Sequence, residues 1–132
     1  MSKGVVLDAS AVLAVLQKER GAEKAADRVY GATISAVNYG EVLKKSAERG
    51  GAIPLVKAIL AQQRLDIVSF DEEHATKAAE IWEACKPFGL SFGDRACVAL
   101  GLLKEATVIT AEHRMSKTPL PVEVELIRSM RD

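Results

Sequence analysis

The sequence contains few cysteines, histidines and aromatic residues, and each shortage argues against a class of function. Two Cys and two His occur among its 132 residues. Cys85 and Cys97 lie in separate helical patterns and match no zinc-binding spacing, so we expect buried, reduced thiols. His74 and His113 fall among charged residues and are expected at the surface. Because aromatic residues make up only 5% of the chain, stacking on nucleic-acid bases should not dominate recognition of a partner.

An excess of one charge and long apolar runs are also missing. The chain carries 18 basic and 18 acidic residues, so its formal net charge is zero. A nucleic-acid partner must therefore be met by a local basic patch. No segment approaches the roughly 20 apolar residues that span a bilayer. The apolar stretch that ends at Leu16 is interrupted by Asp8 and lacks a cleavage pattern, so we expect a soluble, cytoplasmic protein.

The pattern of short apolar runs and amphipathic segments predicts an α/β fold. The chain is long enough for one domain, residues 1–132, that buries roughly two-thirds of its unfolded surface. We predict strands at residues 4–7, 33–34, 66–70, 107–109 and 122–127, and helices at residues 11–16, 22–30, 36–49, 53–65, 71–86 and 91–103. This alternation favours a mainly parallel sheet covered on both faces. Ligands of such folds bind at the carboxyl ends of the strands, where Asp8 and residues 110–112 lie.

Three carboxylates stand in otherwise apolar or small surroundings. Asp8 follows the first strand, Glu41 lies within a predicted helix, and Asp94 lies early in the last one. Burying a carboxylate is costly unless a partner compensates its charge. No Lys or Arg lies inside the apolar segments, so a shared divalent cation with oxygen ligands is the simplest partner. Metal-dependent chemistry on phosphate is the leading hypothesis.

Each acid alone also has an ordinary structural explanation. Asp8 fits an acid that begins a turn between strand and helix, and Glu41 fits a solvated helix residue. Asp94 follows Ser91 by three residues, which is the spacing of a capping box. Against this explanation, Asp94 shares a helical face with Cys97 on the side expected to be buried.

The segment after the fourth strand supplies a further acid and a hydroxyl. Glu112 is a fourth candidate ligand, although as a lone loop acid it would be unremarkable. Thr110 precedes it, and Ser10 can either cap a helix or orient a neighbouring carboxylate. Carboxylates grouped at one sheet edge repel one another unless cations lie between them. Ligation by oxygen alone favours Mg²⁺ or Mn²⁺ over zinc.

Four short motifs follow one another along the chain: residues 7–11, residues 34–38 with Glu41, residues 89–96 and residues 108–111. In this order and spacing the sequence resembles PIN-domain ribonucleases, most of all the VapC-type toxins of bacterial toxin–antitoxin modules. The likeness runs from about residue 5 to residue 127. It implies a three-layer α/β/α PIN-like domain, metal-dependent hydrolysis of RNA, a homodimer, and a small antitoxin protein that occupies the site.

The resemblance assigns roles residue by residue. Asp8, Glu41 and Asp94 match the family's core metal-binding acids, and they carry the catalytic role. Ser10 and Thr110 match its hydroxyl positions. With Mg²⁺ or Mn²⁺ bound, water is activated for attack on phosphorus, so no histidine base is needed.

Glu112 stands where the family usually has Asp. The additional methylene can displace a second metal, so Glu112 is the least secure of the four catalytic and metal-binding acids. Arg95, Arg114 and Lys117 lie near the acids in sequence and are candidates for binding RNA phosphates. Each would also fit an ordinary solvated charge.

Two other functions stay open on the sequence. A phosphotransferase would use Asp8 as a nucleophile, but such enzymes commonly place a second Asp two residues later, where this chain has Ser10. A degenerate, non-catalytic PIN-like module would keep the acids for folding and bind its partner without cleaving RNA. Trapping of an aspartyl phosphate on Asp8 would favour the phosphotransferase. Partner binding without metal-dependent cleavage would favour the non-catalytic module.

Apolar residues on two helices predict a surface for a partner. The first helix carries more of them than one buried face requires: Val12, Leu13, Val15 and Leu16. Residues 53–60 form a second apolar surface. By the family resemblance, we expect an antitoxin segment to dock beside these helices and to direct an Arg or Lys toward the acids.

Overall fold

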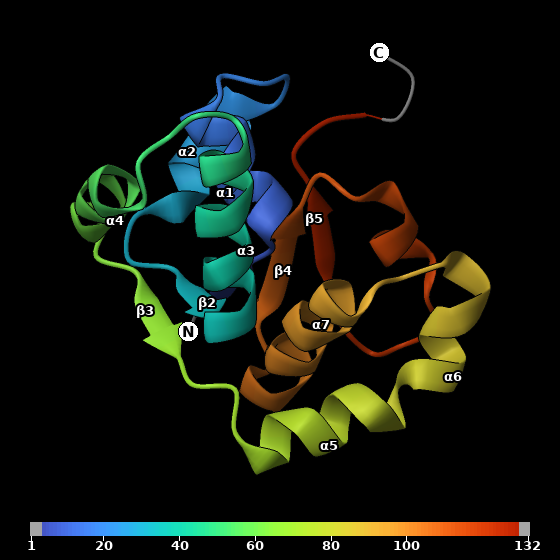
Figure 1. Cartoon of the computed structure of the whole chain (residues 1–132). Coiled ribbons are helices and arrows are strands. Elements are labelled where there is room, and N and C mark those ends of the chain that lie inside the picture. The colour runs from blue at the N-terminus through green and yellow to red at the C-terminus, as the bar shows by residue number, and fades with distance from the viewer. Residues whose placement is uncertain (1–3, 130–132) are drawn as a thin grey trace.

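A computed structural model describes residues 4–129 of the chain (Figure 1). Five short strands form one parallel sheet in the order β3-β2-β1-β4-β5. The strands are β1 (Val5–Leu7), β2 (Thr33–Ser35), β3 (Asp66–Val68), β4 (Thr107–Thr110) and β5 (Val124–Leu126). The predicted parallel α/β fold is confirmed. The domain expected over residues 1–132 includes residues 1–3 and 130–132, which lie outside the described part.

Helices cover both faces of this sheet. The first half of the chain supplies α1 (Ala9–Leu16), α2 (Ala22–Val29), α3 (Ala36–Glu48) and α4 (Ile53–Ala61). The second half supplies α5 (Glu72–Glu80), α6 (Trp82–Cys85) and α7 (Phe92–Lys104), with the 3₁₀ turns η1 (Lys86–Phe88) and η2 (His113–Lys117). Figure 1 shows α1 to α4 gathered on one side and α5 along the opposite edge, next to α7. The three-layer arrangement follows.

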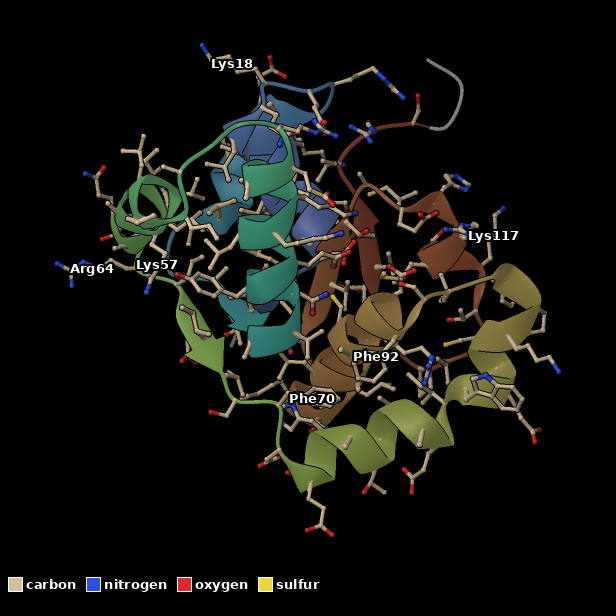
Figure 2. All side chains as sticks on the ribbon, viewed as in Figure 1. Lys18, Lys57, Arg64, Phe70, Phe92 and Lys117 are labelled. Atoms are coloured by element: carbon tan, nitrogen blue, oxygen red, sulfur yellow. The ribbon has the colours of Figure 1, made fainter. Side chains whose placement is uncertain are left out.

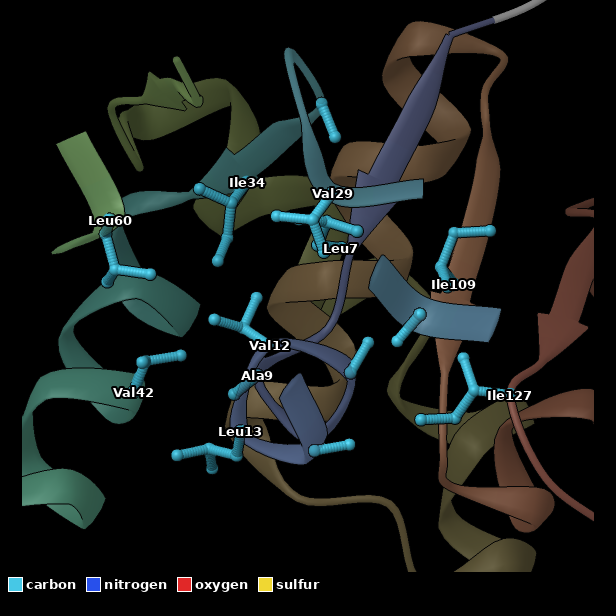
Figure 3. Close-up of a cluster of buried hydrophobic side chains, with 14 of the residues drawn as sticks. Leu7, Ala9, Val12, Leu13, Val29, Ile34, Val42, Leu60, Ile109 and Ile127 are labelled. Carbon is cyan, nitrogen blue, oxygen red and sulfur yellow. The ribbon is translucent and has the colours of Figure 1, made fainter. Parts of the chain in front are cut away.

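Alternation along the central strands produces two separate cores. Leu7 and Ile109 point to the side of α1, where Figure 3 shows them among buried side chains that include Val12. Val6 and Val108 point to the opposite side and pack against residues of α7. Because successive side chains of a strand face opposite ways, a strand buried on both faces must be apolar throughout. β1 meets this requirement and forms the centre of the sheet.

The prediction of an exposed apolar surface on α1 is wrong, whereas the apolar surface predicted on α4 is exposed. Val12 and Leu13 are buried, because α1 packs between α2 and α3 and over the sheet. Val15 and Leu16 are partly buried against the same core. A helix that is apolar on nearly all sides is, in this case, one that other elements surround. On α4, in contrast, Leu55 is 61% exposed and Ile59 is 42% exposed.

The long helix predicted over residues 71–86 is broken into three pieces. α5 ends before Ile81, which has ψ near zero, and α6 and η1 follow. This break turns both Ile81 and Cys85 into the core beside α7. His74, predicted at the surface, is buried, because α5 lies against α7 and the His74 ring packs edge-on against Phe70. Cys85 and Cys97 are free and buried, as expected.

Across residues 4–129 the helices are all too short or too polar to cross a membrane.

The close packing of α7 on the sheet predicts a glycine requirement. A Cβ at Gly101 would lie 2.6 Å from Cγ2 of Val108 and 3.2 Å from Cγ2 of Val122. We expect Gly101→Ala to lower the free energy of unfolding by about 1–3 kcal/mol, since a packed core yields little. Gly40→Ala on α3 is the control. A Cβ at Gly40 would have no atom within 4 Å. This substitution should therefore raise the free energy of unfolding by roughly 0.5–1 kcal/mol. Urea unfolding measures both, and an unchanged midpoint for Gly101→Ala would contradict this packing.

Candidate active site

The site is centred on Asp8, which directly follows the central strand. Its backbone N–H donates to the carbonyl of Ile109 at 2.9 Å, so the pairing of β1 with β4 continues to this residue. α1 begins at Ala9 with Asp8 in the N-cap position, but the Asp8 side chain makes no capping bond. The expected capping role of Ser10 is therefore wrong. The Asp8 carboxylate is free to face the end of the sheet and is only 3% exposed.

Two hydroxyl groups bind one oxygen of this carboxylate. Ser10 Oγ donates to Asp8 Oδ2 at 2.7 Å, and Thr110 Oγ1 donates to the same oxygen at 2.8 Å. Each hydroxyl oxygen in turn accepts a backbone N–H at 2.9 Å, from Ala111 and Glu112 respectively. The network links the β1–α1 turn to the segment after β4. Within residues 4–129, no donor forms a hydrogen bond to the second oxygen, Oδ1.

Burial raises the pKa of Asp8 from 3.8 to about 6, because the ionised form loses hydration inside the protein. The bonds from Ser10 and Thr110 favour the ionised form and oppose this rise, whereas the negative charges of Asp94 and Glu41 add to it. A buried acid with a raised pKa beside other acids is typical of functional sites.

Two helices bring the next two acids beside Asp8. Glu41 lies on α3 and Asp94 on the first turn of α7, and these helices pack together. Gly93 permits this close approach, because a Cβ there would lie 3.2 Å from Oε1 of Glu41. Sequence reasoning missed Asn38, which is fully buried and donates from Nδ2 to the Gly93 carbonyl at 3.0 Å. A polar residue three positions before Glu41 on the same helix was the signal for it.

Asp94 takes part in a capping box and also lines the site. The Ser91 N–H donates to Asp94 Oδ2 at 2.9 Å, and the Asp94 N–H donates to Ser91 Oγ at 3.2 Å. Ser91 caps α7 through this exchange, as the spacing predicted. The two explanations considered for Asp94 are therefore compatible, because the capping contact of its side chain uses Oδ2.

The candidate acids converge on a cleft of about 90 Å³ at the carboxyl end of the sheet. It is lined by Asp8, Ala9, Ser10, Glu41, Lys45, Asp94 and Glu112. Lys45 was not predicted, although it follows Glu41 by one helical turn and lies 3.4 Å from its Oε2. Among residues 4–129, no Lys or Arg forms an ion pair with Asp8 or Asp94. Uncompensated negative charge thus remains in the cleft.

Glu112 lies at the rim of the cleft and is held by Arg114. Nε of Arg114 donates to Oε1 at 2.8 Å and Nη2 donates to Oε2 at 2.9 Å. These bonds, together with the positive charge of Arg114, hold the pKa of Glu112 below its usual value despite partial burial. Glu112 therefore differs from Asp8 and Asp94, because its charge is already paired with a cation.

The other predicted RNA-binding residues lie differently. Arg95 turns toward α5, where its Nη1 donates to the Ala78 carbonyl at 2.8 Å, so the structure does not bring it to the cleft. The Arg95 guanidinium also lies 5.6 Å from the ring of Phe92, which meets Phe70 edge-on (Figure 2). Lys117 is exposed on η2 and points outward in the same view. Their contact with RNA stays a prediction.

Residues 5–120 match the family model described as the PIN domain. The chain belongs to the PIN domain family. A toxin–antitoxin complex from Klebsiella pneumoniae contains a similar fold, with a TM-score of 0.76, 15% sequence identity, and coverage of 96% of this chain and 100% of that one. VapBC from Salmonella typhimurium bound to DNA has a TM-score of 0.70 and 16% sequence identity, and the alignment covers 97% of this chain and 100% of that one. Comparison with curated proteins gave no match.

A third similar structure is VapC20 of Mycobacterium tuberculosis, described as a toxin that cleaves the Sarcin-Ricin loop. Its TM-score is 0.72 at 16% identity, and the alignment covers 86% of this chain and 93% of that one. At such low identity, the solved structures demonstrate a common fold. The expected PIN-like α/β/α architecture is thereby confirmed.

The donor set of this PIN domain fits a divalent cation. Asp8, Glu41 and Asp94 present carboxylate oxygens, and Asp8 Oδ1 has no donor among the described residues. Hard cations such as Mg²⁺ and Mn²⁺ prefer this type of ligand. A tighter group, Asp71, Glu73 and His74, brings its ligand atoms within 4.8 Å. It shares no residue with the cleft, and Asp71 already caps α5 by accepting the His74 N–H.

The raised pKa of Asp8 predicts how stability depends on pH in this PIN domain. The folded value of about 6 exceeds the unfolded value of 3.8. Asp8 therefore stabilises the metal-free fold most below the unfolded pKa, and this contribution is lost as pH rises through 6. In EDTA at neutral pH, Asp8→Asn should raise the free energy of unfolding by on the order of 3 kcal/mol or less.

Urea unfolding between pH 4 and pH 8 measures this effect. The advantage of Asp8→Asn should shrink toward pH 4, where wild-type Asp8 is neutral. Asp27→Asn on the exposed surface of α2 is the matched control, and it should stay within about 0.5 kcal/mol of wild type. An advantage that is independent of pH would show that Asp8 ionises without cost.

Proposed function

We propose that this chain is a metal-dependent endoribonuclease that hydrolyses RNA phosphodiester bonds and acts as the toxin of a cytoplasmic toxin–antitoxin pair. One observation carries the proposal: Asp8, Glu41 and Asp94 line one cleft at the carboxyl end of a parallel sheet. Asp8 and Asp94 have no cationic partner among residues 4–129. A divalent cation would supply the missing positive charge.

The residues of the cleft divide the work of such a reaction. Bound Mg²⁺ or Mn²⁺ would activate water and neutralise charge on the phosphate. Asp8, Glu41 and Asp94 would hold the cation and fix its place against the strand of RNA. Ser10 and Thr110 keep Asp8 in one orientation and favour its ionised form. Within residues 4–129 no histidine lines the cleft, and water activated by a metal ion requires no imidazole base.

The similar structures support the toxin role. The proteins from Klebsiella pneumoniae and Salmonella typhimurium are toxin–antitoxin complexes, and VapC20 is described as a toxin that cleaves the Sarcin-Ricin loop. By analogy we propose an RNA substrate, a homodimer and an inhibitory antitoxin protein for this chain. A non-catalytic PIN-like module is the alternative, and it would retain partner binding without cleavage.

The antitoxin is proposed to dock on the exposed apolar surface of α4. An adjoining groove of about 290 Å³ is lined by Tyr39, Lys57, Leu60, Ala61, Arg64, Leu65 and Ile67. Figure 2 shows Lys57 and Arg64 projecting from this side of the molecule. An amphipathic helix with acidic flanks would fit such a groove. Tyr39 and Glu41 are two residues apart on α3, so their side chains lie on different faces of this helix, and among the described residues the groove and the cleft share no lining residue. A segment of the antitoxin that extends past α3 would be needed to reach the acids.

Removal of one charge in the cleft should abolish metal binding and cleavage while the fold persists. We expect Asp8→Asn, Glu41→Gln and Asp94→Asn each to lower cleavage of RNA by at least about 100-fold, because a lost ligand weakens the cation site. Asp27→Asn should cleave as wild type. Cleavage is followed on total RNA with Mn²⁺ and with EDTA, and Mn²⁺ binding by calorimetry. Cleavage that persists in EDTA would contradict the proposal.

Binding of the antitoxin should depend on the exposed apolar surface of α4. Leu55→Lys and Ile59→Lys place a charge on the α4 surface, and we expect each to weaken binding of the protein encoded by the neighbouring reading frame at least tenfold. Cleavage by these variants alone should be unchanged. Ala26→Lys, at an exposed position of α2, adds the same charge elsewhere and should bind normally. Equal binding by all three variants would exclude α4 as the docking surface.

A further inference from the structure

We propose that Glu112 is a positioning residue for Arg114, and that Arg114 binds a phosphate of the RNA strand at the rim of the cleft. This inference rests on the proposed nuclease function and assigns Glu112 a role different from that of a metal ligand. It is carried by the geometry of the Glu112–Arg114 pair and by the distribution of charge around the cleft.

The Arg114 guanidinium is held at three points. Its Nε and Nη2 donate to the two carboxylate oxygens of Glu112, and its Nη1 donates to the Gly89 carbonyl at 3.2 Å. Glu112 Oε1 also accepts the backbone N–H of Arg114 at 3.2 Å, which caps η2. A guanidinium has five N–H groups in one plane. Three are used here, so two remain on a side chain that is 51% exposed.

Stability alone does not account for this arrangement. The two side chains are 28% and 51% exposed, and an exposed ion pair typically contributes only about 0–1 kcal/mol. The bidentate geometry instead removes the rotational freedom of a long side chain. A fixed guanidinium is suited to a phosphate, because its planar N–H groups match two phosphate oxygens.

The backbone of Glu112 is tied to the centre of the site. Thr110 Oγ1 accepts the N–H of Glu112 at 2.9 Å and donates its own proton to Asp8 at 2.8 Å. One hydroxyl therefore connects the proposed cation site with the residue that holds Arg114. A shift of the loop after β4 would move both.

The distribution of charge around the cleft makes Arg114 the cation placed to bind a phosphate. Among the described residues that line the cleft or its rim, four carry carboxylates and Lys45 is the only cation. Lys45 lies against Glu41, on the α3 side. The contact with Glu112 is the main reason that the pKa of Arg114 is raised, and the negative charge of Asp94 adds a smaller rise. The acids of the cleft repel an approaching RNA strand, which is a polyanion. A cation held beside the loop after β4 offsets this repulsion and favours binding of the strand.

Exchange of Glu112 for shorter or neutral side chains distinguishes the two roles. If Glu112 were a metal ligand, Glu112→Asp would match the family and keep full activity, and Glu112→Gln would weaken Mn²⁺ binding. If Glu112 positions Arg114, both variants loosen the guanidinium and leave Mn²⁺ binding within twofold of wild type. In that case both raise KM for RNA about five- to tenfold with little change in kcat, as expected for lost uniform binding.

A double-mutant cycle tests the coupling. We expect Arg114→Gln to weaken binding of a fluorescent single-stranded oligoribonucleotide in EDTA by about five- to tenfold. It should also lower the slope of log affinity against log salt by roughly 0.7, the value for one phosphate contact. Glu112→Gln combined with Arg114→Gln should be no weaker than Arg114→Gln alone. Arg114→Lys, which keeps the charge but not the planar fork, should restore only part of the affinity.

Matched controls lie at the far end of α7. Lys104→Gln and Glu105→Gln make the same charge changes outside the cleft and should leave RNA affinity, KM and Mn²⁺ binding at wild-type values. Tenfold weaker Mn²⁺ binding by Glu112→Gln with unchanged RNA affinity would overturn the inference. So would effects of Glu112→Gln and Arg114→Gln that add in the double variant. A wild-type protein that cleaves no RNA, while Arg114→Gln still weakens RNA binding, would overturn the nuclease proposal alone.

Discussion

The buried carboxylate of Asp8 is the constraint on which the rest of the site depends. A charge at the end of the central strand is costly inside a protein, and two hydroxyls from different segments compensate part of that cost. Thr110 reaches Asp8 only because β4 pairs in parallel with β1 and ends beside it. Sheet topology and local hydrogen bonding therefore act together, and any change of register would separate Asp8 from Thr110.

The acids around the cleft fall into two kinds. Asp8 and Asp94 have no cationic partner within the described chain, whereas Glu41 lies near Lys45 and Glu112 is held by Arg114. The negative charges of the unpaired acids would be compensated by a divalent cation. The paired acids carry their own compensation, and for Glu112 this pairing also fixes the direction of a guanidinium. The cleft thus combines a proposed cation site with a proposed phosphate contact on one rim.

Local patterns predicted much of this structure because they reflect short-range physics. Short continuous apolar runs located the strands, and serine caps located the starts of α3 and α7. The same patterns failed where neighbours far along the chain decide. The apolar excess of α1 is enclosed by α2, α3 and the sheet, and His74 is buried because α5 lies on α7. Neither neighbour is visible within a window of a few residues.

The sequence by itself determined the fold class, the order of its elements and the acids that meet at the end of the sheet. These depend on hydrophobic periodicity, capping and the shared direction of parallel strands. Only the tertiary structure decided how each acid is compensated. Asp8 relies on Thr110 across the β1–β4 pairing, and Gly93 lets α7 approach Glu41 closely. Glu112 turns to Arg114, because hydrogen-bond geometry depends on loop conformation, which residue spacing does not specify.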